Sequence, residues 1–412
     1  MSIQDELAAV AGAANVLTGE AAAPFLVDWR GRYRGQAQAV VRPGNTAEVA
    51  AVVRLCHERR IPIVPQGGNT GLCGGATADD SGTAVVLSMA RMNAIRAIDT
   101  ANDTLVADAG CTLQQVQQAA RDAGRLFPLS LAAEGTCTIG GNLATNAGGT
   151  QVLRYGNTRD LALGLEVVTA EGEVWHGLRG LRKDNTGYDL RDLYIGSEGT
   201  LGIITAATLK LHPLPAAQRT AMLALDSVED AIGLLAHAKK GFGPALTGFE
   251  VMAGHVLHDV VRMFPPQRLP FDGPSAEAPY FALLELSDME GEEHAQAQFE
   301  NVLGAAMEDG LVLDAAIAES LAQSKAFWHL RESVPLAEAS PGKSIKHDVS
   351  VPISAVAEFV READAALQAR FPSMRTITFG HLGDGNVHYN VSRGVDQTEE
   401  QVVGLTKEVY AI

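Results

Sequence analysis

The chain has 412 residues, with 32 Lys and Arg against 49 Asp and Glu, so its formal net charge is −17. At roughly 100–200 residues per domain, this length predicts two to three domains. A composition that is 46% hydrophobic and 20% charged indicates a globular protein. The acidic balance disfavours nucleic acid or an anionic membrane surface as the main partner, because both repel a net anion.

Cysteine spacing and the N-terminal residues indicate the compartment. Cys56, Cys73, Cys111 and Cys137 form no C-x-x-C pair, which favours free thiols in a reducing environment over a zinc site or a redox pair. Residues 1–20 lack the basic start and apolar core of a secretory signal. The sequence contains no run of 18 apolar residues, so no transmembrane helix is predicted. We therefore expect a cytoplasmic protein.

The first half of the chain predicts short strands and helices in alternation. Asn45 followed by Glu48 is typical of a helix N-terminus, here of a helix reaching about Arg59, and Thr112 with Gln115 repeats the pattern. Five apolar and β-branched runs predict strands, and the two runs on either side of the Ala-Glu-Gly turn at 170–172 predict a hairpin. These runs are Ile61–Val64, Ala84–Met89, Leu105–Ala107, Leu163–Thr169 and Glu173–Trp175.

Two prolines in residues 211–215 predict a linker. Beyond it, the pattern predicts helices near 227–240, 290–309 and 353–370, and strands near 278–286 and 346–352, which together indicate a second α+β domain. A last amphipathic helix is predicted from about Thr398. It has no terminating Gly, Pro or polar tail before Ile412, so we expect the chain to stop inside this helix and the polypeptide to be incomplete.

Glycine is concentrated in residues 61–210, which hold 22 of the 42 glycines. Three segments stand out, at 65–75, 134–149 and 196–205. Small residues let successive backbone N–H groups converge on an anion such as a pyrophosphate, with the side chains of Asn69 and Thr70 as further donors. Tight turns without a ligand are the alternative interpretation of the first segment. The second segment favours the ligand, because a stretch of sixteen positions that is almost wholly small or amide residues forms no packed core but can run extended beside a flat molecule.

In this order and spacing the three segments resemble the FAD-binding domain of the vanillyl-alcohol oxidase / p-cresol methylhydroxylase (PCMH) flavoproteins, over about residues 37–215. The resemblance implies FAD, with the first segment at the pyrophosphate and the other two along the isoalloxazine and ribityl groups. Covalently flavinylated relatives carry His where this chain has Asn69, so we expect dissociable FAD. The implied cofactor-binding residues are Gln66, Gly67, Gly68, Asn69, Thr70, Gly71, Gly135, Thr136, Ile139, Gly140, Gly141, Asn142, Thr145, Asn146, Gly149, Glu198, Gly202 and Ile204.

A histidine–glycine segment at 379–390 is the other dense feature. His381 and His388 are seven residues apart, which on a straight strand puts them on opposite faces. The Gly-Asp-Gly-Asn run between them predicts a turn that brings both rings together, and an imidazole pair suits Zn²⁺ and similar metals. An ordinary polar hairpin is the alternative. His57, His255 and His258 have no such context and are interpreted as surface or core residues.

The segment His-Leu-Gly-Asp-Gly-Asn-Val-His at 381–388 is similar to the metal motif of the FAD-linked 2-hydroxyacid dehydrogenases, most of all their D-2-hydroxyglutarate branch. The resemblance makes His381 and His388 metal ligands and Asn390 a substrate contact. Two upstream segments make Arg331 the carboxylate-binding arginine and Lys346 a second cation. The family's closing Glu-His-Gly motif, with a third metal ligand and the general-base histidine, is not in this chain and is expected beyond its end. Pro335 stands where the family has a hydroxyl residue, which leaves the fine substrate preference open.

The resemblance as a whole implies an α+β fold. A helical lead-in at 1–36 precedes a two-subdomain PCMH-type FAD-binding domain at 37–215 and an incomplete substrate, or cap, domain at 216–412. It implies oxidation of a D-2-hydroxy acid, D-2-hydroxyglutarate first, with FAD and Zn²⁺ or a similar metal. An electron-transfer flavoprotein or a quinone is the expected acceptor, and a homodimer is the commonest assembly. Glycolate or D-lactate as substrate, and an inactive flavin-binding subunit, are the alternatives.

Overall fold

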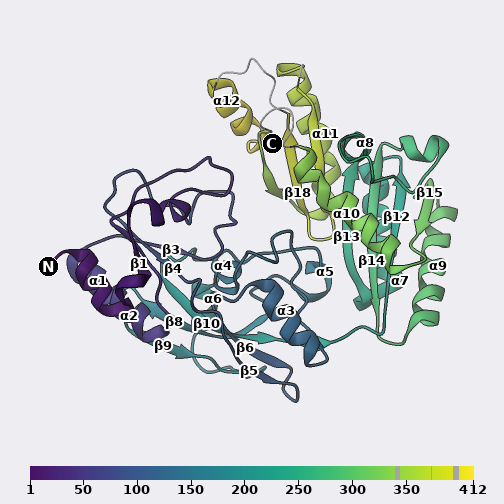
Figure 1. Cartoon of the computed structure of the whole chain (residues 1–412). Coiled ribbons are helices and arrows are strands. Elements are labelled where there is room, and N and C mark those ends of the chain that lie inside the picture. Colours follow the sequence, from purple (N-terminus) through teal and green to yellow (C-terminus); the bar gives the residue numbers. More distant parts are fainter. Residues whose placement is uncertain (339–343, 373, 393–398) are drawn as a thin grey trace. The chain divides into compact units, whose positions relative to one another are not determined.

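The computed structural model describes residues 1–338, 344–372, 374–392 and 399–412, and it forms two compact units. Unit 1 comprises Met1–Gly149 and Tyr155–Leu214, and unit 2 comprises Thr150–Arg154 and Pro215–Ile412 (Figure 1). The boundary after Leu214 falls within the predicted linker. The segment Thr150–Arg154 belongs to unit 2 although it lies far upstream of that boundary in the sequence.

Unit 1 holds three sheets. The first is mostly parallel, with the spatial order β1 (Val16–Leu17), β2 (Ala39–Val41), β4 (Val85–Ser88) and β3 (Ile63–Gln66). The second is antiparallel, in the order β5 (Ile95–Asp99), β6 (Thr104–Asp108), β10 (Gly202–Lys210), β8 (Ala162–Thr169) and β9 (Val174–Gly177). The third pairs β7 (Arg125–Leu126) with β11 (His212–Pro213). The helices are α1 (Ile3–Ala11), α2 (Thr46–Arg59), α3 (Leu113–Asp122), α4 (Ile139–Ala144) and α6 (Leu190–Tyr194), and α5 (Val152–Tyr155) spans the two units in sequence.

The local sequence signals explain most of these elements. Asn45 caps α2 by accepting from the Glu48 N–H at 2.9 Å, and Thr112 and Gln115 form a reciprocal capping box at α3, so both predicted helix starts are confirmed. The strand predicted at 61–64 instead covers Ile63–Gln66, because Ile61 still donates to the Cys56 carbonyl and finishes the end of α2. The linker prediction is wrong at His212–Pro213, which pairs as β11.

Unit 2 is a seven-stranded antiparallel sheet. Its spatial order is β15 (Asp314–Ile317), β12 (Ala217–Leu225), β14 (Tyr280–Asp288), β13 (Leu246–Ala253), β17 (Thr376–His381), β18 (Asn386–Val391) and β16 (Asp348–Ser350). The helices are α7 (Val228–Phe242), α8 (Gly254–Met263), α9 (Glu292–Glu308), α10 (Leu321–Ala337), α11 (Val356–Arg370) and α12 (Glu399–Val409). The last predicted helix is confirmed, but its proposed start at Thr398 lies outside the described residues, and it ends at Val409 rather than running to Ile412.

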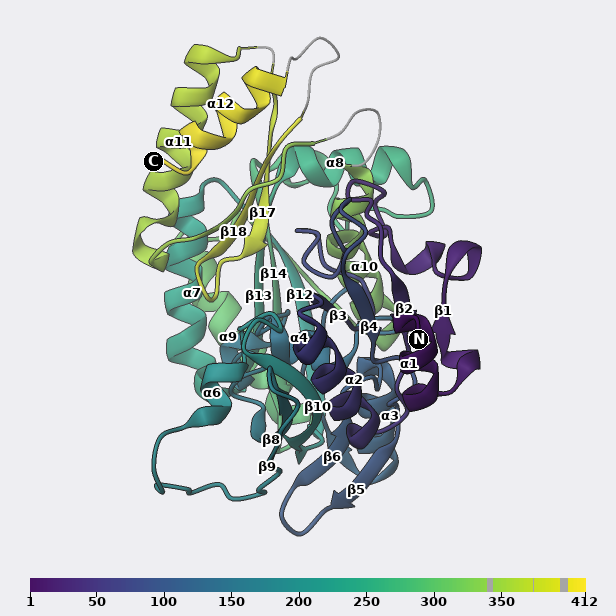
Figure 2. The same cartoon turned by 90° about the vertical axis from the view of Figure 1, so that its left-hand side faces the viewer.

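Each face of this sheet is covered by its own set of helices. One face packs against α7, α9 and α11, and the opposite face packs against α8 and α10 (Figure 1). Figure 2 shows α11 and α12 beside the β17–β18 hairpin. Because side chains alternate along a strand, every second residue of β13, β17 and β18 points toward the α8–α10 side. That side carries polar and charged residues among its apolar ones.

Candidate functional site

The three glycine-rich segments of unit 1 meet in space. A Cβ on Gly68 would overlap the Thr136 carbonyl oxygen, and one on Gly67 would overlap the Thr138 hydroxyl, so the first segment lies directly on the second. Two backbone hydrogen bonds join the third segment to the second. The Gly196 N–H donates to the Leu143 carbonyl at 3.0 Å, and the Glu198 N–H donates to the Ala144 carbonyl at 2.8 Å. Three stretches far apart in sequence therefore build one surface.

The backbone of the first segment is free to bind an anion. No N–H from Gly67 to Gly71 donates a hydrogen bond to any residue that the structure describes. A Cβ on Gly71 would meet nothing within 4 Å, so its surroundings are open. Asn69 has φ 53°, in the left-handed region that successive N–H groups need to turn toward one point. These residues fit a pyrophosphate such as that of FAD.

The side chains of several implied cofactor residues form hydrogen bonds within the protein that hold the loops of this surface in place. The Gln66 amide donates to the carbonyls of Phe25 and Ala76, and the Asn69 amide donates to the Val27 carbonyl at 2.8 Å. This bond uses one of the two N–H groups of the Asn69 amide, so the expectation that its side chain also donates to the ligand stays a prediction. Gly67 and Gly68 also lie against the second segment, where any larger side chain would overlap Thr138 or Thr136, so contact between the two loops is a further reason for glycine at these positions.

In the second and third segments, too, most side chains of the implied cofactor residues are engaged within the protein. Thr138 caps α4, Ile139 and Asn142 are buried, and the Thr145 hydroxyl donates to the Gly141 carbonyl. The remaining implied residues are held by packing or by positive φ angles: Gly135 beside Gln114, Thr136 on the Ala133 carbonyl, Gly140 against Ala109, Asn146 and Glu198 in the left-handed region, Gly149 on the Ser130 carbonyl, Gly202 against Val167, and Ile204 in β10. The Thr70 carbonyl accepts from the Trp29 indole at 3.1 Å. Backbone groups are what this surface offers to a ligand.

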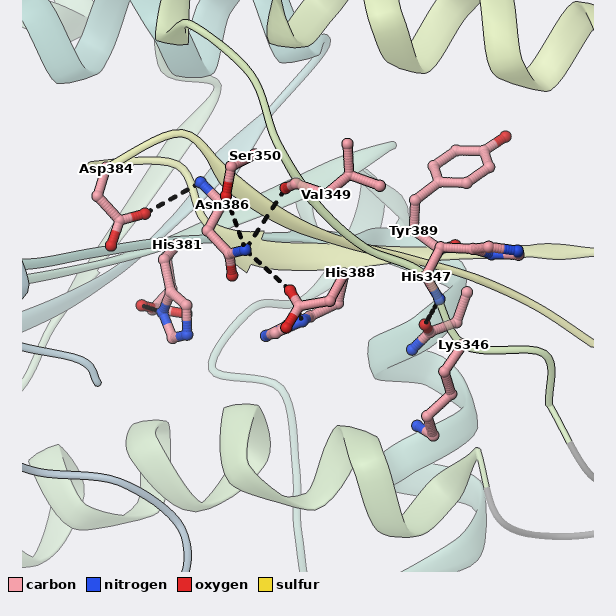
Figure 3. A network of polar contacts seen from close by, with 12 residues as sticks. Lys346, His347, Val349, Ser350, His381, Asp384, Asn386, His388 and Tyr389 are labelled. Carbon is pink, nitrogen blue, oxygen red and sulfur yellow. Dashed lines mark hydrogen bonds and ion pairs between the residues drawn. The ribbon is translucent and has the colours of Figure 1, made fainter. Parts of the chain in front are cut away.

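In unit 2 the predicted turn brings the two histidines together. Residues 381 and 386 are register partners in the β17–β18 hairpin, so His388, two residues further on, lies on the same face as His381. The ring centroids are 5.4 Å apart, and Figure 3 shows both rings on one side of the strands, with Tyr389 on the other. The turn that overcomes the odd spacing is confirmed.

A carboxylate fixes each imidazole. Glu250 in β13 accepts from Nδ1 of His381 at 2.5 Å, and Asp348 in β16 lies 3.2 Å from Nδ1 of His388. Nε2 of each ring has no hydrogen-bond partner within the described part of the chain, so both are available as ligands. Two imidazoles are fewer than the three protein ligands that a catalytic zinc site normally has, and no group of three His, Cys, Asp or Glu residues among those described could hold a metal.

Glu250 also holds the arginine. Its second oxygen accepts from Nε of Arg331 in α10 at 2.8 Å, and both side chains are buried. Burial by itself raises the pKa of Glu250, but attraction by His381 and Arg331 outweighs burial and lowers this pKa to about 2. Arg331 rests on the Phe379 ring, 4.8 Å from its centroid, and its two terminal nitrogens donate to none of the described residues. That fork can bind a carboxylate in bidentate fashion.

Lys346 and Asn390 are engaged by a residue that the sequence did not indicate. Glu338 forms an ion pair with the Lys346 ammonium group and accepts from the Asn390 amide at 2.6 Å. The Asn390 oxygen accepts from the backbone N–H of His347 at 3.1 Å (Figure 3). Both ends of the Asn390 side chain thus have a partner within the protein, while its amide keeps a second N–H group. The expectation that Asn390 contacts the substrate stays a prediction.

Comparisons with known proteins agree with both units. A family model described as "FAD binding domain" matches residues 37–177, and one described as "FAD linked oxidases, C-terminal domain" matches residues 214–412. The D-2-hydroxyglutarate dehydrogenase of Xanthomonas citri is 40% identical over 93% of this chain and 78% of its own length. The chain belongs to the FAD-linked oxidase family related to D-2-hydroxyglutarate dehydrogenase.

Other members of the family are longer than this FAD-linked oxidase chain. The mitochondrial D-2-hydroxyglutarate dehydrogenase of Bos taurus is 39% identical and is matched over 66% of its length, and a probable one of Oryza sativa is 38% identical over 64%. The chain thus spans about two thirds of these relatives. In the described residues no helix is long and apolar enough to cross a membrane.

Solved structures support the fold. An alkyldihydroxyacetonephosphate synthase matches with a TM-score of 0.77 at 18% identity, covering 99% of this chain and 80% of the other. A p-cresol methylhydroxylase matches with a TM-score of 0.74 at 16% identity, covering 99% and 85%. The α+β flavoprotein fold that the glycine segments predicted is therefore confirmed.

Of the other histidines on this FAD-linked oxidase, His255 and His258 in α8 bond to backbone carbonyls, those of Thr376 at 2.9 Å and Ala276 at 2.8 Å. Sequence analysis missed Glu250, Asp348 and Glu338. Glu250 carried a signal, since it is a charged residue within the apolar strand Leu246–Ala253. Glu338 carried none beyond its place two helical turns after the arginine.

Proposed function

We propose that the complete protein is an FAD-dependent dehydrogenase that oxidises a D-2-hydroxy acid to the 2-oxo acid, and that this chain supplies its FAD surface, its carboxylate-binding arginine and its histidine pair. D-2-hydroxyglutarate is the first substrate to test, because several relatives are named for it. The observation that carries the proposal is the Glu250 bridge. One buried carboxylate fixes a carboxylate-binding guanidinium and an imidazole of the histidine pair on the same face of one sheet.

Each group has a defined task. The Arg331 fork grips the substrate carboxylate and so orients the 2-hydroxyl. His381 and His388 would hold a zinc-type ion, which would supply charge that lowers the pKa of that hydroxyl. Bound FAD would supply the acceptor for the hydride from the substrate carbon, and a histidine of the complete protein would take the hydroxyl proton. A following electron acceptor, either an electron-transfer flavoprotein or a quinone, would reoxidise the flavin.

A glycolate or D-lactate dehydrogenase is the second candidate. It is favoured by the pairing of Lys346 with Glu338, which leaves Arg331 as the cation with free donors for a substrate carboxylate. An inactive flavin-binding subunit is a third candidate, favoured by the finding of two rather than three metal ligands in the described residues.

Anaerobic bleaching of the flavin tests these candidates. The FAD-loaded chain is mixed in the absence of oxygen with D-2-hydroxyglutarate, D-lactate, the L-enantiomers of these two acids, or the achiral glycolate. Loss of the flavin absorbance is followed. We expect bleaching by one or more D-acids and by none of the L-acids. Arg331→Lys keeps the charge paired with Glu250 but loses the fork, so kcat/KM should fall about 10- to 100-fold while FAD content stays the same. No bleaching by any acid would reject the oxidation and favour the flavin-binding subunit.

A further inference from the structure

Glu338 stands where a ligand carboxylate would stand. It caps the C-terminal end of α10, and its side chain is 2% exposed. Its two oxygens engage Lys346 and Asn390, the two groups that the sequence indicated as contacts of the substrate. The protein therefore already places one of its own carboxylates on its second cation.

Glu338 and Arg331 lie along the same side of α10. They are seven residues apart, which is two helical turns or roughly 10.5 Å along the axis. Arg331 rests on Phe379 of β17, and Glu338 reaches Asn390 of β18; register places Phe379 opposite His388, so all of these side chains belong to one sheet face. Because Glu338 forms an ion pair with Lys346, the second cation lies at the Glu338 end of this face, two helical turns along α10 from the guanidinium of Arg331.

The charges on this face are balanced without a ligand. Arg331 is paired with Glu250, and Lys346 is paired with Glu338. A monocarboxylate can bind the free fork of Arg331 and leave both pairs intact. A dicarboxylate that uses Lys346 has to displace Glu338, which would leave a buried carboxylate without its cation, and such a group is costly.

We propose that Glu338 is a specificity-determining residue that competes with the distal carboxylate of a dicarboxylate ligand for Lys346. It thereby weakens binding of C5 2-oxo and 2-hydroxy diacids relative to monoacids of similar length. The inference rests on the proposed function, because it takes Arg331 as the site of the first carboxylate.

The test is calorimetric titration of the FAD-loaded chain with 2-oxoglutarate and with 2-oxobutyrate. Glu338→Gln keeps the size of the side chain and removes its charge, so Lys346 becomes available. We expect the Kd of 2-oxoglutarate to fall tenfold or more and the Kd of 2-oxobutyrate to stay within twofold. An unchanged ratio of the two Kd values, or an equal change in both, would overturn the proposal.

Three further variants keep the result interpretable. Glu292→Gln removes the same charge from an exposed ion pair with Arg219 in the same unit and should leave both Kd values unchanged. Adding Lys346→Gln to Glu338→Gln should abolish the gain for 2-oxoglutarate. Should Glu338→Gln fail to fold, Glu338→Asp retains the charge but is too short to hold both partners, and a smaller gain is expected; no gain would count against the proposal.

The experiment separates the two hypotheses. A gain for 2-oxoglutarate without any flavin bleaching by hydroxy acids would support the role of Glu338 and reject the oxidation. Bleaching by hydroxy acids with an unchanged Kd ratio would support the oxidation and reject the role of Glu338. Failure of both 2-oxo acids to bind any variant, together with no flavin bleaching by any hydroxy acid, would reject both hypotheses.

Discussion

The two units build their candidate sites from different parts of the chain. In unit 1 the ligand surface is backbone, with N–H groups from Gly67 to Gly71 left free and side chains such as that of Gln66 used to hold the loops. In unit 2 the surface is side chain, with Arg331, His381 and their shared carboxylate Glu250 brought in from three separate elements. A backbone site depends on small residues in one stretch, whereas a side-chain site depends on partners that only the fold brings together.

The largest effect should come from breaking the shared carboxylate. Glu250→Gln removes a buried charge that Arg331 and His381 both contact, and leaving the guanidinium unpaired costs about 3–5 kcal/mol. We expect unit 2 to lose stability in thermal unfolding and 2-hydroxy acid binding to fall with it. The affinity for FAD should be unchanged, because the cofactor surface is built in unit 1.

Glu285 provides the matched control for that variant. It is a second buried glutamate on the same sheet face, but its partner is the neutral Trp328 indole at 2.8 Å, and burial raises its pKa. Glu285→Gln keeps an oxygen for the indole and removes an unpaired buried charge, so it should be neutral or slightly stabilising at pH 7. Equal destabilisation by the two variants would mean that burial, rather than the shared contact, explains the effect.

A smaller but sharper effect is expected in unit 1. In Gly68→Ala the added Cβ overlaps the Thr136 carbonyl, and forcing the two loops apart costs about 1–3 kcal/mol. The variant should lose FAD on gel filtration while substrate-analogue binding to unit 2 persists. Retention of FAD with wild-type affinity would show that the contact of the two loops does not shape the cofactor surface.

Gly71→Ala separates packing from ligand approach. Its added Cβ meets nothing within 4 Å, so the melting temperature of the FAD-free chain should not change. If FAD affinity falls nonetheless, the methyl group obstructs the cofactor itself. This pair of variants therefore tests whether the loop glycines serve the fold at one position and the ligand at another.

This difference explains what sequence analysis recovered in unit 1. The three glycine segments could be recognised because each is contiguous in the sequence. The role of individual residues was not readable, because the sequence does not show that Gly68 faces Thr136 or that Asn69 reaches the Val27 carbonyl. Both facts depend on contacts between segments far apart in the chain.

In unit 2 the sequence indicated single residues and missed their partners. The Gly-Asp-Gly-Asn turn sufficed to place His381 beside His388, since a hairpin is a local structure. Glu250 lies 131 positions from His381, and its pairing depends on strand order in the sheet. Glu338 neutralises Lys346 through the end of a helix, which no motif records.

A partly exposed ion pair of unit 2 tests whether burial of both partners is what gives Glu250 its weight. His294 in α9 donates through Nδ1 to Asp288 at 2.7 Å, and this hydrogen bond raises the pKa of His294. A raised pKa means that the pair stabilises the fold fully below about pH 6.5, the value in an unfolded chain, and that this contribution is lost as pH rises through the raised pKa. The melting temperature of His294→Gln should therefore be slightly below that of the wild type at pH 6 and equal to it at pH 9. The difference in melting temperature should be the smallest of these effects, because the His294 side chain is 39% exposed and solvent screens its charge. A gap as large as that of Glu250→Gln, or one that grows toward pH 9, would show that pairing alone rather than pairing in a buried site decides stability here.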